Sequence, residues 1–313
     1  MIISTDLIKR HKEYKKFIIN NKIKVGEYWE NIQVDFNSEL SKYGWKNLGK
    51  QNFFPIKVDN IDQNGVSINH SFIKNDSNNN SLINNNHFYE LLKKNTLLSK
   101  YKNILEIGAG CGILASLLLQ EKKKYFIVDI PNMIVCSSSY LMTIFPDKKY
   151  CLPNELTKSD DLNQKDIIFI TPNQIKFLKN NYFDLIINNQ SFQEMNYNEI
   201  DAYFYLIKRS LKIEGKFFCS NRLKKETNYF DYPWRILNNF KIEFIRKNTF
   251  HIKNNNYLTY LDKLLTKKDT NDKIYNLNPI KKIILLNSFS LKERFFWFKK
   301  FLKFIVRSLI GRN

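Results

Sequence analysis

Three of the nine glycines in this 313-residue chain fall within five positions, at Gly108, Gly110 and Gly112. They lie in the run ILEIGAGCGI, behind a short apolar stretch and ahead of LASLLL. A glycine turn between a strand and a helix lets the backbone adopt positive φ and approach a ligand closely. The third glycine comes one residue too early for G-x-G-x-x-G, and no G-K-[ST] follows. The pattern therefore argues against a pyrophosphate ligand.

Two acidic residues flank this turn. Glu106 lies two positions before the first glycine, and Asp129 ends the next apolar run, YFIVD. A carboxylate at Glu106 would repel a phosphate but suits a cofactor with an ammonium group, and an acid at Asp129 can accept both hydroxyls of a ribose. A positively charged nucleoside without a phosphate matches these features, and S-adenosyl-L-methionine is such a cofactor.

The surrounding sequence predicts an α/β domain in which short apolar strands alternate with amphipathic helices. The predicted strands are NILEI, YFIVD, DIIFIT, YFDLIIN, IEGKFFCSN, FKIEFIRK and KKIILLNSF. This alternation indicates a mostly parallel sheet of about seven strands with helices on both faces. Ligands bind such sheets at the carboxyl ends of the strands, so we expect the glycine turn, Asp129, Asn173 and residues 188–194 on one rim.

These blocks resemble a known family. LEIGAGCG, with VD at the end of the following strand, resembles the cofactor signature of the class I, Rossmann-like, S-adenosylmethionine-dependent methyltransferases. FDLIINNQSFQEM resembles the family's fourth strand and the loop after it, and LKIEGKFF resembles the turn into its fifth strand. IVDIPNMIVCSSSYLMTIFP and INNQSFQEM look like the sugar O-methyltransferases found among bacterial surface-polysaccharide genes. The general resemblance spans residues 100–222.

The resemblance implies an enzyme that binds S-adenosyl-L-methionine. A metal-dependent site would need further acids on this rim, and the sequence shows none beyond Glu194, so no metal is expected. The residues expected to contact the cofactor are Glu106, Gly108, Ala109, Gly110, Gly112, Asp129, Ile130, Asn173, Gln174 and Asn188. Asn173 and Gln174 are included by position, because this family usually contacts the adenine after its third strand.

Methylation of a weakly acidic sugar hydroxyl should be helped by a general base on the same rim. Glu194 is the first candidate because it closely follows the fourth strand, and the alternative is a carboxylate that ties this loop to a neighbouring helix. His251 is a second candidate, because histidine has an unperturbed pKa suited to a base. Asp231 is the third, within NYFDYPWR, whose aromatic side chains would either stack on a sugar or pack on the core.

The chain divides into three predicted parts. Residues 1–100 are expected to form a mostly helical accessory region with an Asn-rich loop, residues 101–288 the methyltransferase domain, and residues 289–313 a basic amphipathic helix. Such a helix is typical of contact with an anionic membrane surface, and packing onto the domain is the alternative. No apolar run reaches the ~18 residues needed to span a bilayer. No secretory signal or disulfide pattern is evident, so we expect a cytoplasmic protein with peripheral contact at the inner membrane face.

The net charge of +20 leaves a second class of partner open. It favours an anionic partner, which could be nucleic acid, a membrane or an acidic substrate, or it reflects only a lysine-rich surface. The Pro-containing tetrad of exocyclic-amine methylation is missing after the fourth strand, where the chain reads Asn188-Asn189-Gln190-Ser191. The first interpretation is therefore a sugar or glycan O-methyltransferase. The alternatives are an RNA methyltransferase and a non-catalytic scaffold that keeps the cofactor fold.

Overall fold

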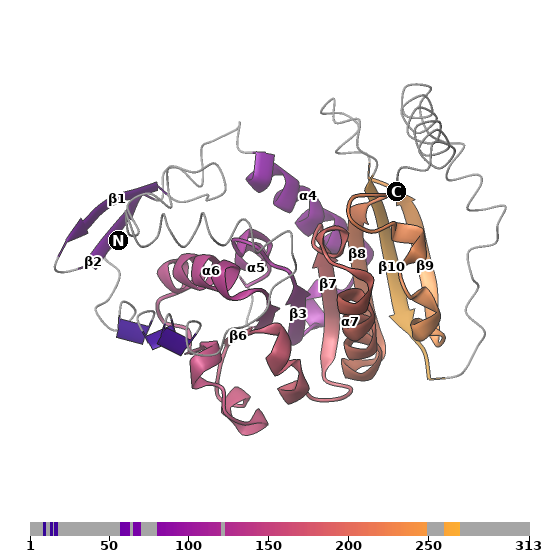
Figure 1. The fold of residues 1–313 in the computed structure, drawn as a ribbon. Helices are drawn as coiled ribbons and strands as arrows, with labels where there is room; N and C mark the ends of the chain where they lie inside the picture. The colour runs from indigo at the N-terminus through magenta and orange to yellow at the C-terminus, as the bar shows by residue number, and fades with distance from the viewer. Residues whose placement is uncertain are drawn as a thin grey trace, which may run out of the picture.

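The computed structural model describes residues 9–10, 13–14, 16–17, 57–62, 65–69, 80–119, 123–248 and 260–269. Within them, an eight-stranded sheet lies at the centre, and a separate two-stranded hairpin precedes it in the chain (Figure 1). The strands are β1 (Lys57–Asp62), β2 (Gly65–Asn69), β3 (Asn103–Ile107), β4 (Lys124–Val128), β5 (Tyr150–Cys151), β6 (Ile167–Ile170), β7 (Phe183–Asn189), β8 (Leu211–Arg222), β9 (Phe240–Lys247) and β10 (Tyr260–Lys267). The α-helices are α4 (Asn80–Asn95), α5 (Ile113–Leu118), α6 (Pro131–Ile144) and α7 (Tyr197–Ser210). The 3₁₀ turns are η2 (Leu98–Lys100), η3 (Pro153–Glu155), η4 (Ser159–Leu162), η5 (Pro172–Phe177), η6 (Phe192–Glu194), η7 (Tyr229–Asp231) and η8 (Trp234–Leu237).

The sheet has the strand order β5-β6-β4-β3-β7-β8-β10-β9. β3 pairs in parallel with β4 on one side and with β7 on the other, so the chain starts in the middle, builds one half and then crosses to the other. In a doubly wound sheet, ligands bind at this reversal, at the carboxyl ends of the strands. Of the eight strands, β10 alone runs antiparallel to its neighbours, and its arrow in Figure 1 points opposite to that of β9.

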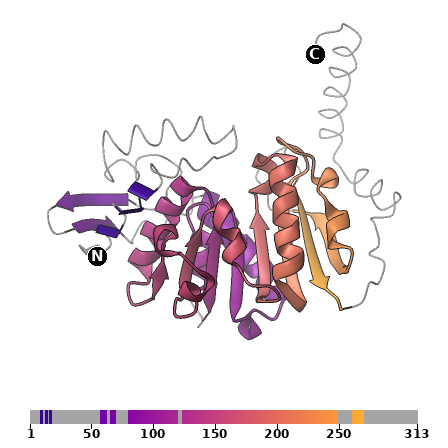
Figure 2. The same ribbon diagram turned by 60° about the horizontal axis from the view of Figure 1, so that its bottom comes forward.

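Both faces of the sheet are covered, which accounts for the apolar runs in its central strands, β4, β6 and β7. On one face, side chains of α4, α5 and α6 such as Phe88, Leu114 and Tyr140 pack against the sheet. On the other face, α7 and several 3₁₀ segments contribute Phe192 and Phe204. The β1–β2 hairpin and the β9–β10 pair lie at opposite sides of the molecule in both ribbon views (Figures 1 and 2).

Helix α7 begins at a reciprocal cap. Asn196 Oδ1 accepts a hydrogen bond from Glu199 N, and Glu199 Oε2 accepts one from Asn196 N. These bonds satisfy two backbone donors at the helix start. The predicted apolar face of this helix is confirmed, since Ile200, Phe204 and Ile207 are buried. The cap fixes where the loop after β7 ends, and that loop carries Glu194.

Three sequence predictions about elements need correction. The prediction of seven strands was wrong, because the sheet has eight. The two-residue β5 is too short to leave an apolar pattern, and β10 was not predicted because it carries charged residues at Asp262, Lys263 and Lys267. The sequence NEIDAYFYLIKRSLK predicts a helix through Lys212, but the helix ends at Ser210, and Leu211 already belongs to β8.

Two further predictions fall on parts of the chain outside the described residues. These are the strand at 281–289 and the basic helix at 289–313. Within the described part of the chain, a bilayer-spanning helix is absent, since none has both the required length and the required hydrophobicity.

Candidate functional site

The glycine turn joins β3 to α5 in a conformation that favours glycine. Gly108, Gly110 and Gly112 have φ values of 74°, 58° and 79°, where a side chain costs roughly 1–2 kcal/mol. Ala109 O accepts a hydrogen bond of 3.0 Å from Gly112 N, which closes the turn. A Cβ at Gly108 would lie 1.9 Å from Ser191 Oγ, whereas a Cβ at Gly110 would meet no atom within 4 Å. The middle of the turn is therefore open to a ligand.

Glu106 and Asp129 lie at the carboxyl ends of adjacent parallel strands. Glu106 Oε2 accepts a hydrogen bond of 2.8 Å from Tyr125 Oη. Asp129 accepts two hydrogen bonds of 2.8 Å, from Gly110 N and Ile130 N. The two acids are 2% and 9% exposed. Among the residues that the structure describes, neither acid forms an ion pair.

The electrostatics of these carboxyl groups indicate one shared site. Burial raises the pKa of Glu106 to about 7, against the lowering effect of the Tyr125 hydrogen bond, and the charge of Asp129 raises it further. Burial also raises the pKa of Asp129 to about 7, its backbone hydrogen bonds oppose this, and the charge of Glu194 adds to the increase. A cationic ligand would stabilise the ionised forms that burial disfavours.

Asn188 links the ends of three strands. Its Nδ2 donates to Ile107 O at 3.0 Å, and its Oδ1 accepts from Asn221 Nδ2 at 2.8 Å. Asn221 Oδ1 accepts in turn from Gln193 N. This fully buried amide pair holds the loop after β7 against β3 and β8. Direct contact of Asn188 with a cofactor stays a prediction.

Asn173 and Gln174 lie in η5, after β6. Gln174 Nε2 donates to Pro153 O at 2.8 Å and its Oε1 accepts from Thr171 N at 3.2 Å, so both ends of this buried amide are bonded within the chain. Asn173 is exposed, and its Oδ1 accepts from Thr171 Oγ1. The side chain of Asn173 is therefore accessible for the predicted adenine contact. Gln174 could make that contact only by giving up its hydrogen bonds to Pro153 or Thr171.

Of the predicted catalytic residues, Glu194 lies near enough to Asp129 for its charge to contribute to the raised pKa of that carboxyl. Glu194 Oε1 lies 2.7 Å from Lys225 Nζ, and both side chains are 19% exposed. Its partner thus comes from the segment after β8 and not from a neighbouring helix. Asp231 is exposed at the end of η7, and His251 lies outside the described residues.

The aromatic segment around Asp231 packs onto the core. Tyr229 and Tyr232 are 1% and 3% exposed. The ring of Trp234 lies 5.1 Å from that of Phe204 on α7 and 5.3 Å from that of Tyr229. Of the two interpretations of these side chains, the structure favours packing over stacking on a sugar.

Residues near the start of the chain also reach this region. Tyr14 is fully buried, and its Oη donates a hydrogen bond of 3.2 Å to Pro131 O at the start of α6. Burial raises the pKa of Tyr14, and the nearby charge of Asp129 adds to this effect. Arg10 forms an ion pair with Glu155 at 2.7 Å. These contacts attach Arg10 and Tyr14 to the domain, with Tyr14 near Asp129.

Sequence reasoning missed Tyr125, and it placed Ser191 and Gln190 on this rim without foreseeing what they do there. Ser191 fills the space beside Gly108, and Tyr125 orients Glu106. Gln190 has a φ of 61°, unusual for a residue other than glycine, at the end of β7. Tyr125 could have been found by strand alternation, because it lies four positions before Asp129 and so on the same face. Nothing in the sequence indicates the packing of Ser191 against Gly108 or the positive φ of Gln190.

No protein-family model and no curated protein matches this chain. Similar solved structures include a protein described as a sarcosine dimethylglycine methyltransferase from Galdieria sulphuraria, with 13% identity, a TM-score of 0.45, and coverage of 75% of this chain and 98% of the other. A type 11 methyltransferase from Sulfolobus solfataricus has 18% identity and a TM-score of 0.37, over 56% of this chain and 89% of the other. The O-methyltransferase segment StiE 961–1257 has 14% identity and a TM-score of 0.45, over 64% of this chain and 80% of the other.

Proposed function

We propose that this protein is an S-adenosyl-L-methionine-dependent methyltransferase. The observation that carries the proposal is the pair of buried carboxyl groups, Glu106 and Asp129, beside a glycine turn that is open at Gly110. When bound, S-adenosyl-L-methionine supplies a methyl group activated by a sulfonium centre. Its positive charges and ribose hydroxyls match two acids that have no cationic partner in the described part of the chain.

Each part of the rim has a distinct task in this proposal. Asp129 is fixed by the backbone N–H groups of Gly110 and Ile130, which leaves carboxylate lone pairs to accept ribose hydroxyls. Glu106 is fixed by Tyr125 and faces the cationic end of the cofactor. Gly110 lets the backbone approach the cofactor without a side chain between them.

Glu194 is the base of the proposed reaction. Its carboxylate would remove a proton from an acceptor hydroxyl, and Lys225 Nζ, 2.7 Å from Oε1, orients it. The hydroxyl oxygen must also be aligned with the methyl carbon for in-line displacement. The loop that carries Glu194 is held by Asn188 and Asn221 and is therefore suited to such alignment.

Substitution of Glu194 by glutamine tests this assignment. We expect turnover to fall about 100-fold or more, the contribution typical of a general base, with cofactor affinity unchanged. The matched control is Glu199→Gln, five positions along the chain, where the carboxylate caps α7 instead. Equal turnover in the two variants would show that Glu194 is not the general base.

The acceptor in this proposal is a sugar hydroxyl of a surface polysaccharide or its precursor. Support comes from the two sequence blocks that resemble bacterial sugar O-methyltransferases, residues 127–146 and 187–195. RNA is the second candidate acceptor, favoured by the net charge of +20. Retention on RNA that weakens steeply with salt would favour the second candidate, and methylation of a nucleotide sugar in the absence of RNA would favour the first.

A further inference from the structure

A groove at the opposite end of the sheet combines three cations with several amide groups. It has a volume of about 510 Å³ and is lined by Asn180, Asn181, Tyr205, Lys208, Arg209, Asn239 and Lys267. These residues lie at the start of β7, the end of α7, the start of β9 and the end of β10. Because β10 is antiparallel, its carboxyl end meets the amino ends of the parallel strands. The groove is thus on the rim opposite the glycine turn.

The charge in this groove is not neutralised within the described part of the chain, where Lys208, Arg209 and Lys267 form no ion pair. Lys267 is 6% exposed, and both burial and the charge of Lys208 lower its pKa. Burial also lowers the pKa of Arg209. Cations that are close together and partly desolvated favour an anion between them.

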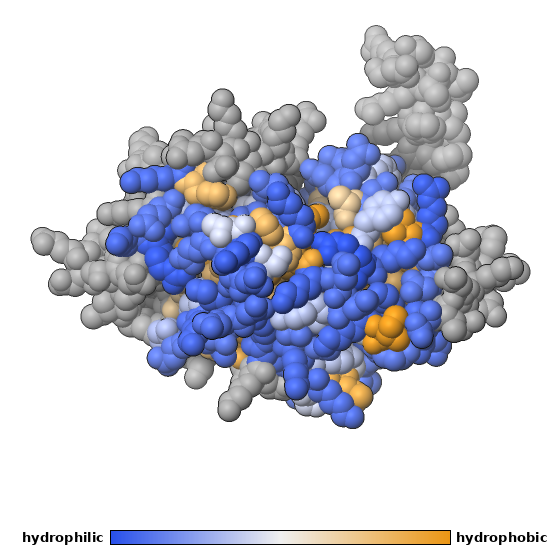
Figure 3. Space-filling view, turned by 90° about the horizontal axis from the view of Figure 1, so that it is seen from below, coloured by the Kyte–Doolittle hydropathy of each residue, from blue (hydrophilic) through white to orange (hydrophobic). Residues whose placement is uncertain are grey.

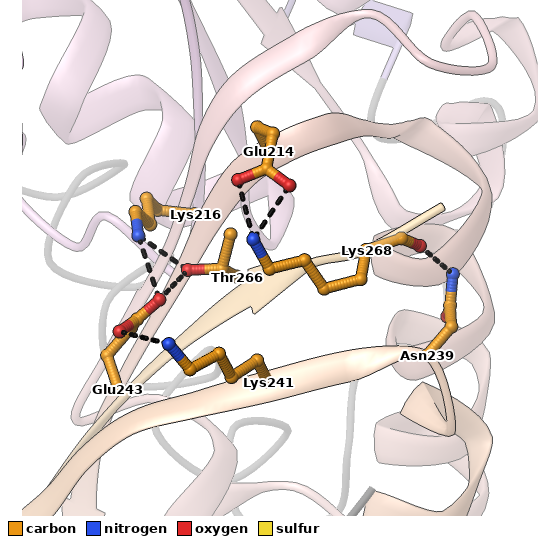
Figure 4. A network of polar contacts seen from close by, with 7 residues as sticks. All are labelled: Glu214, Lys216, Asn239, Lys241, Glu243, Thr266 and Lys268. Carbon is orange, nitrogen blue, oxygen red and sulfur yellow. Dashed lines mark hydrogen bonds and ion pairs between the residues drawn. The ribbon is translucent and has the colours of Figure 1, made fainter. Parts of the chain in front are cut away.

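Neighbouring lysines on the same end of the sheet are arranged differently. Lys268 Nζ lies 2.8 Å from Glu214, and Lys216 Nζ lies 3.2 Å from Glu243, which also pairs with Lys241 (Figure 4). The lack of acidic partners is therefore a property of the groove and not of this whole region. Figure 3 looks at the molecule from this end and shows that hydrophilic residues predominate on the surface.

Unused hydrogen-bond donors remain on all three cations. Within the residues that the structure describes, Lys208 Nζ donates to Asn238 Oδ1 alone, which leaves two of its three N–H groups. Lys267 Nζ donates to Leu211 O and Asn181 Oδ1, which leaves one. Arg209 donates from its two terminal nitrogens to three oxygens, which leaves two of its five N–H groups. Several donors around one concave surface suit the oxygens of a phosphate.

The groove also has an apolar wall and an unused acceptor. The Tyr205 side chain is 62% exposed and lines the groove. Asn239 Oδ1 is buried and accepts no hydrogen bond within the described part of the chain. A ligand larger than a phosphate ion would use both features, with a ring against Tyr205 and a donor toward Asn239.

We propose that this groove binds the phosphate group of a small organic phosphate, with Lys208, Arg209 and Lys267 facing the anion and Tyr205 facing the organic part. This site is separate from the proposed methyltransferase rim and does not depend on that function. Its ligand class is a phosphate monoester with a planar or apolar substituent.

Calorimetric titration of the full chain with phenyl phosphate, inorganic phosphate and phenol tests the proposal. We expect phenyl phosphate to bind more tightly than inorganic phosphate, and phenol not to bind. Lys208→Met should weaken both anions at least tenfold, equivalent to about 1.4 kcal/mol. Tyr205→Ala should weaken phenyl phosphate and leave inorganic phosphate unchanged. Because the Tyr205 side chain is 62% exposed, its removal should not disturb the core. The control Lys268→Met removes a lysine that already pairs with Glu214 and should change neither affinity.

Three outcomes would overturn the proposal. The first is the absence of heat when either phosphate is titrated to 10 mM, which would mean that any binding is weaker than about 2.7 kcal/mol. The second is equal weakening by Lys208→Met and Lys268→Met, which would indicate general charge screening. The third is tight, salt-sensitive binding of a short single-stranded RNA without binding of phenyl phosphate, which would make the groove a nucleic-acid surface.

Discussion

Replacing Asp129 with asparagine should stabilise the empty protein. In the folded chain burial raises the pKa of this carboxyl to about 7, against about 3.9 for an unfolded aspartate. At 1.36 kcal/mol for each pKa unit, the charged carboxylate costs about 4 kcal/mol of folding free energy. Part of this cost is the repulsion between the charges of Asp129 and Glu106, which is shared between the two groups. We therefore expect the free energy of unfolding of the variant to be about 2–4 kcal/mol higher than that of the wild type.

The sign of the effect fixes its pH dependence. The folded state binds the proton of Asp129 more tightly than the unfolded state, so the wild type loses stability as the pH rises from about 4 to about 7. Asparagine does not ionise and resembles the protonated acid. The difference between the two proteins should therefore be near zero at pH 4, grow up to pH 7 and stay constant above it.

Urea denaturation without cofactor at pH 4.5, 6, 7.5 and 8.5 measures this difference. A suitable control is Asp161→Asn, because Asp161 is an exposed carboxylate whose pKa is lowered by hydrogen bonds from Lys158 and Thr157. That substitution should destabilise the protein at neutral pH, opposite in sign to Asp129→Asn. An Asp129→Asn protein that is less stable than the wild type at pH 7.5, by as much as at pH 4.5, would refute the reasoning.

Further substitutions test the packing at Gly108, the space for a ligand at Gly110 and the buried charge of Lys263. Gly110→Ala should lower cofactor affinity at least tenfold but destabilise the fold by only about 1–2 kcal/mol, the cost of its left-handed φ; unchanged affinity would contradict this. Gly108→Ala should be far less stable to urea, because its Cβ would lie 1.9 Å from Ser191 Oγ. Lys263→Met should stabilise the fold at pH 6 and have no effect near pH 10.5, since burial lowers the pKa of Lys263 to about 7. Burying the charged ammonium costs about 5 kcal/mol of folding free energy. Its Nζ lies 3.5 Å from the centroid of the Trp234 ring, and this cation–π contact offsets about 2 kcal/mol of that cost. Equal effects of Lys263→Met at both pH values would be inconsistent with a buried charge.

Much of the central sheet could be predicted from the sequence because its strands are locally consistent. The predicted strands in the 103–107, 125–129, 166–171 and 182–188 regions are all found, as are β8 and β9. Most of them contain a short apolar run, and β9 alternates apolar and charged residues. Both patterns are local, so no distant contact is needed to recognise these strands. The two acids and the glycine turn follow from this pattern, because parallel strands bring their carboxyl ends together.

The parts that could not be predicted depend on partners far away in the chain. Asp262 in β10 accepts hydrogen bonds from Ser220 and Asn248, and Lys263 lies against the ring of Trp234. The sequence alone does not show those partners, so the charged residues of YLDKLLTK indicate an exposed segment. The same holds for Glu194, because only the fold brings Lys225 to its carboxylate.

The most direct test of the site is a calorimetric comparison of S-adenosyl-L-methionine, S-adenosyl-L-homocysteine and NAD on the same protein at pH 7.5. A binding site made by Glu106 and Asp129 should bind the first two compounds. It should not bind the dinucleotide, because two carboxylates would repel its pyrophosphate. Tighter binding of NAD than of either sulfur-containing nucleoside would contradict the account.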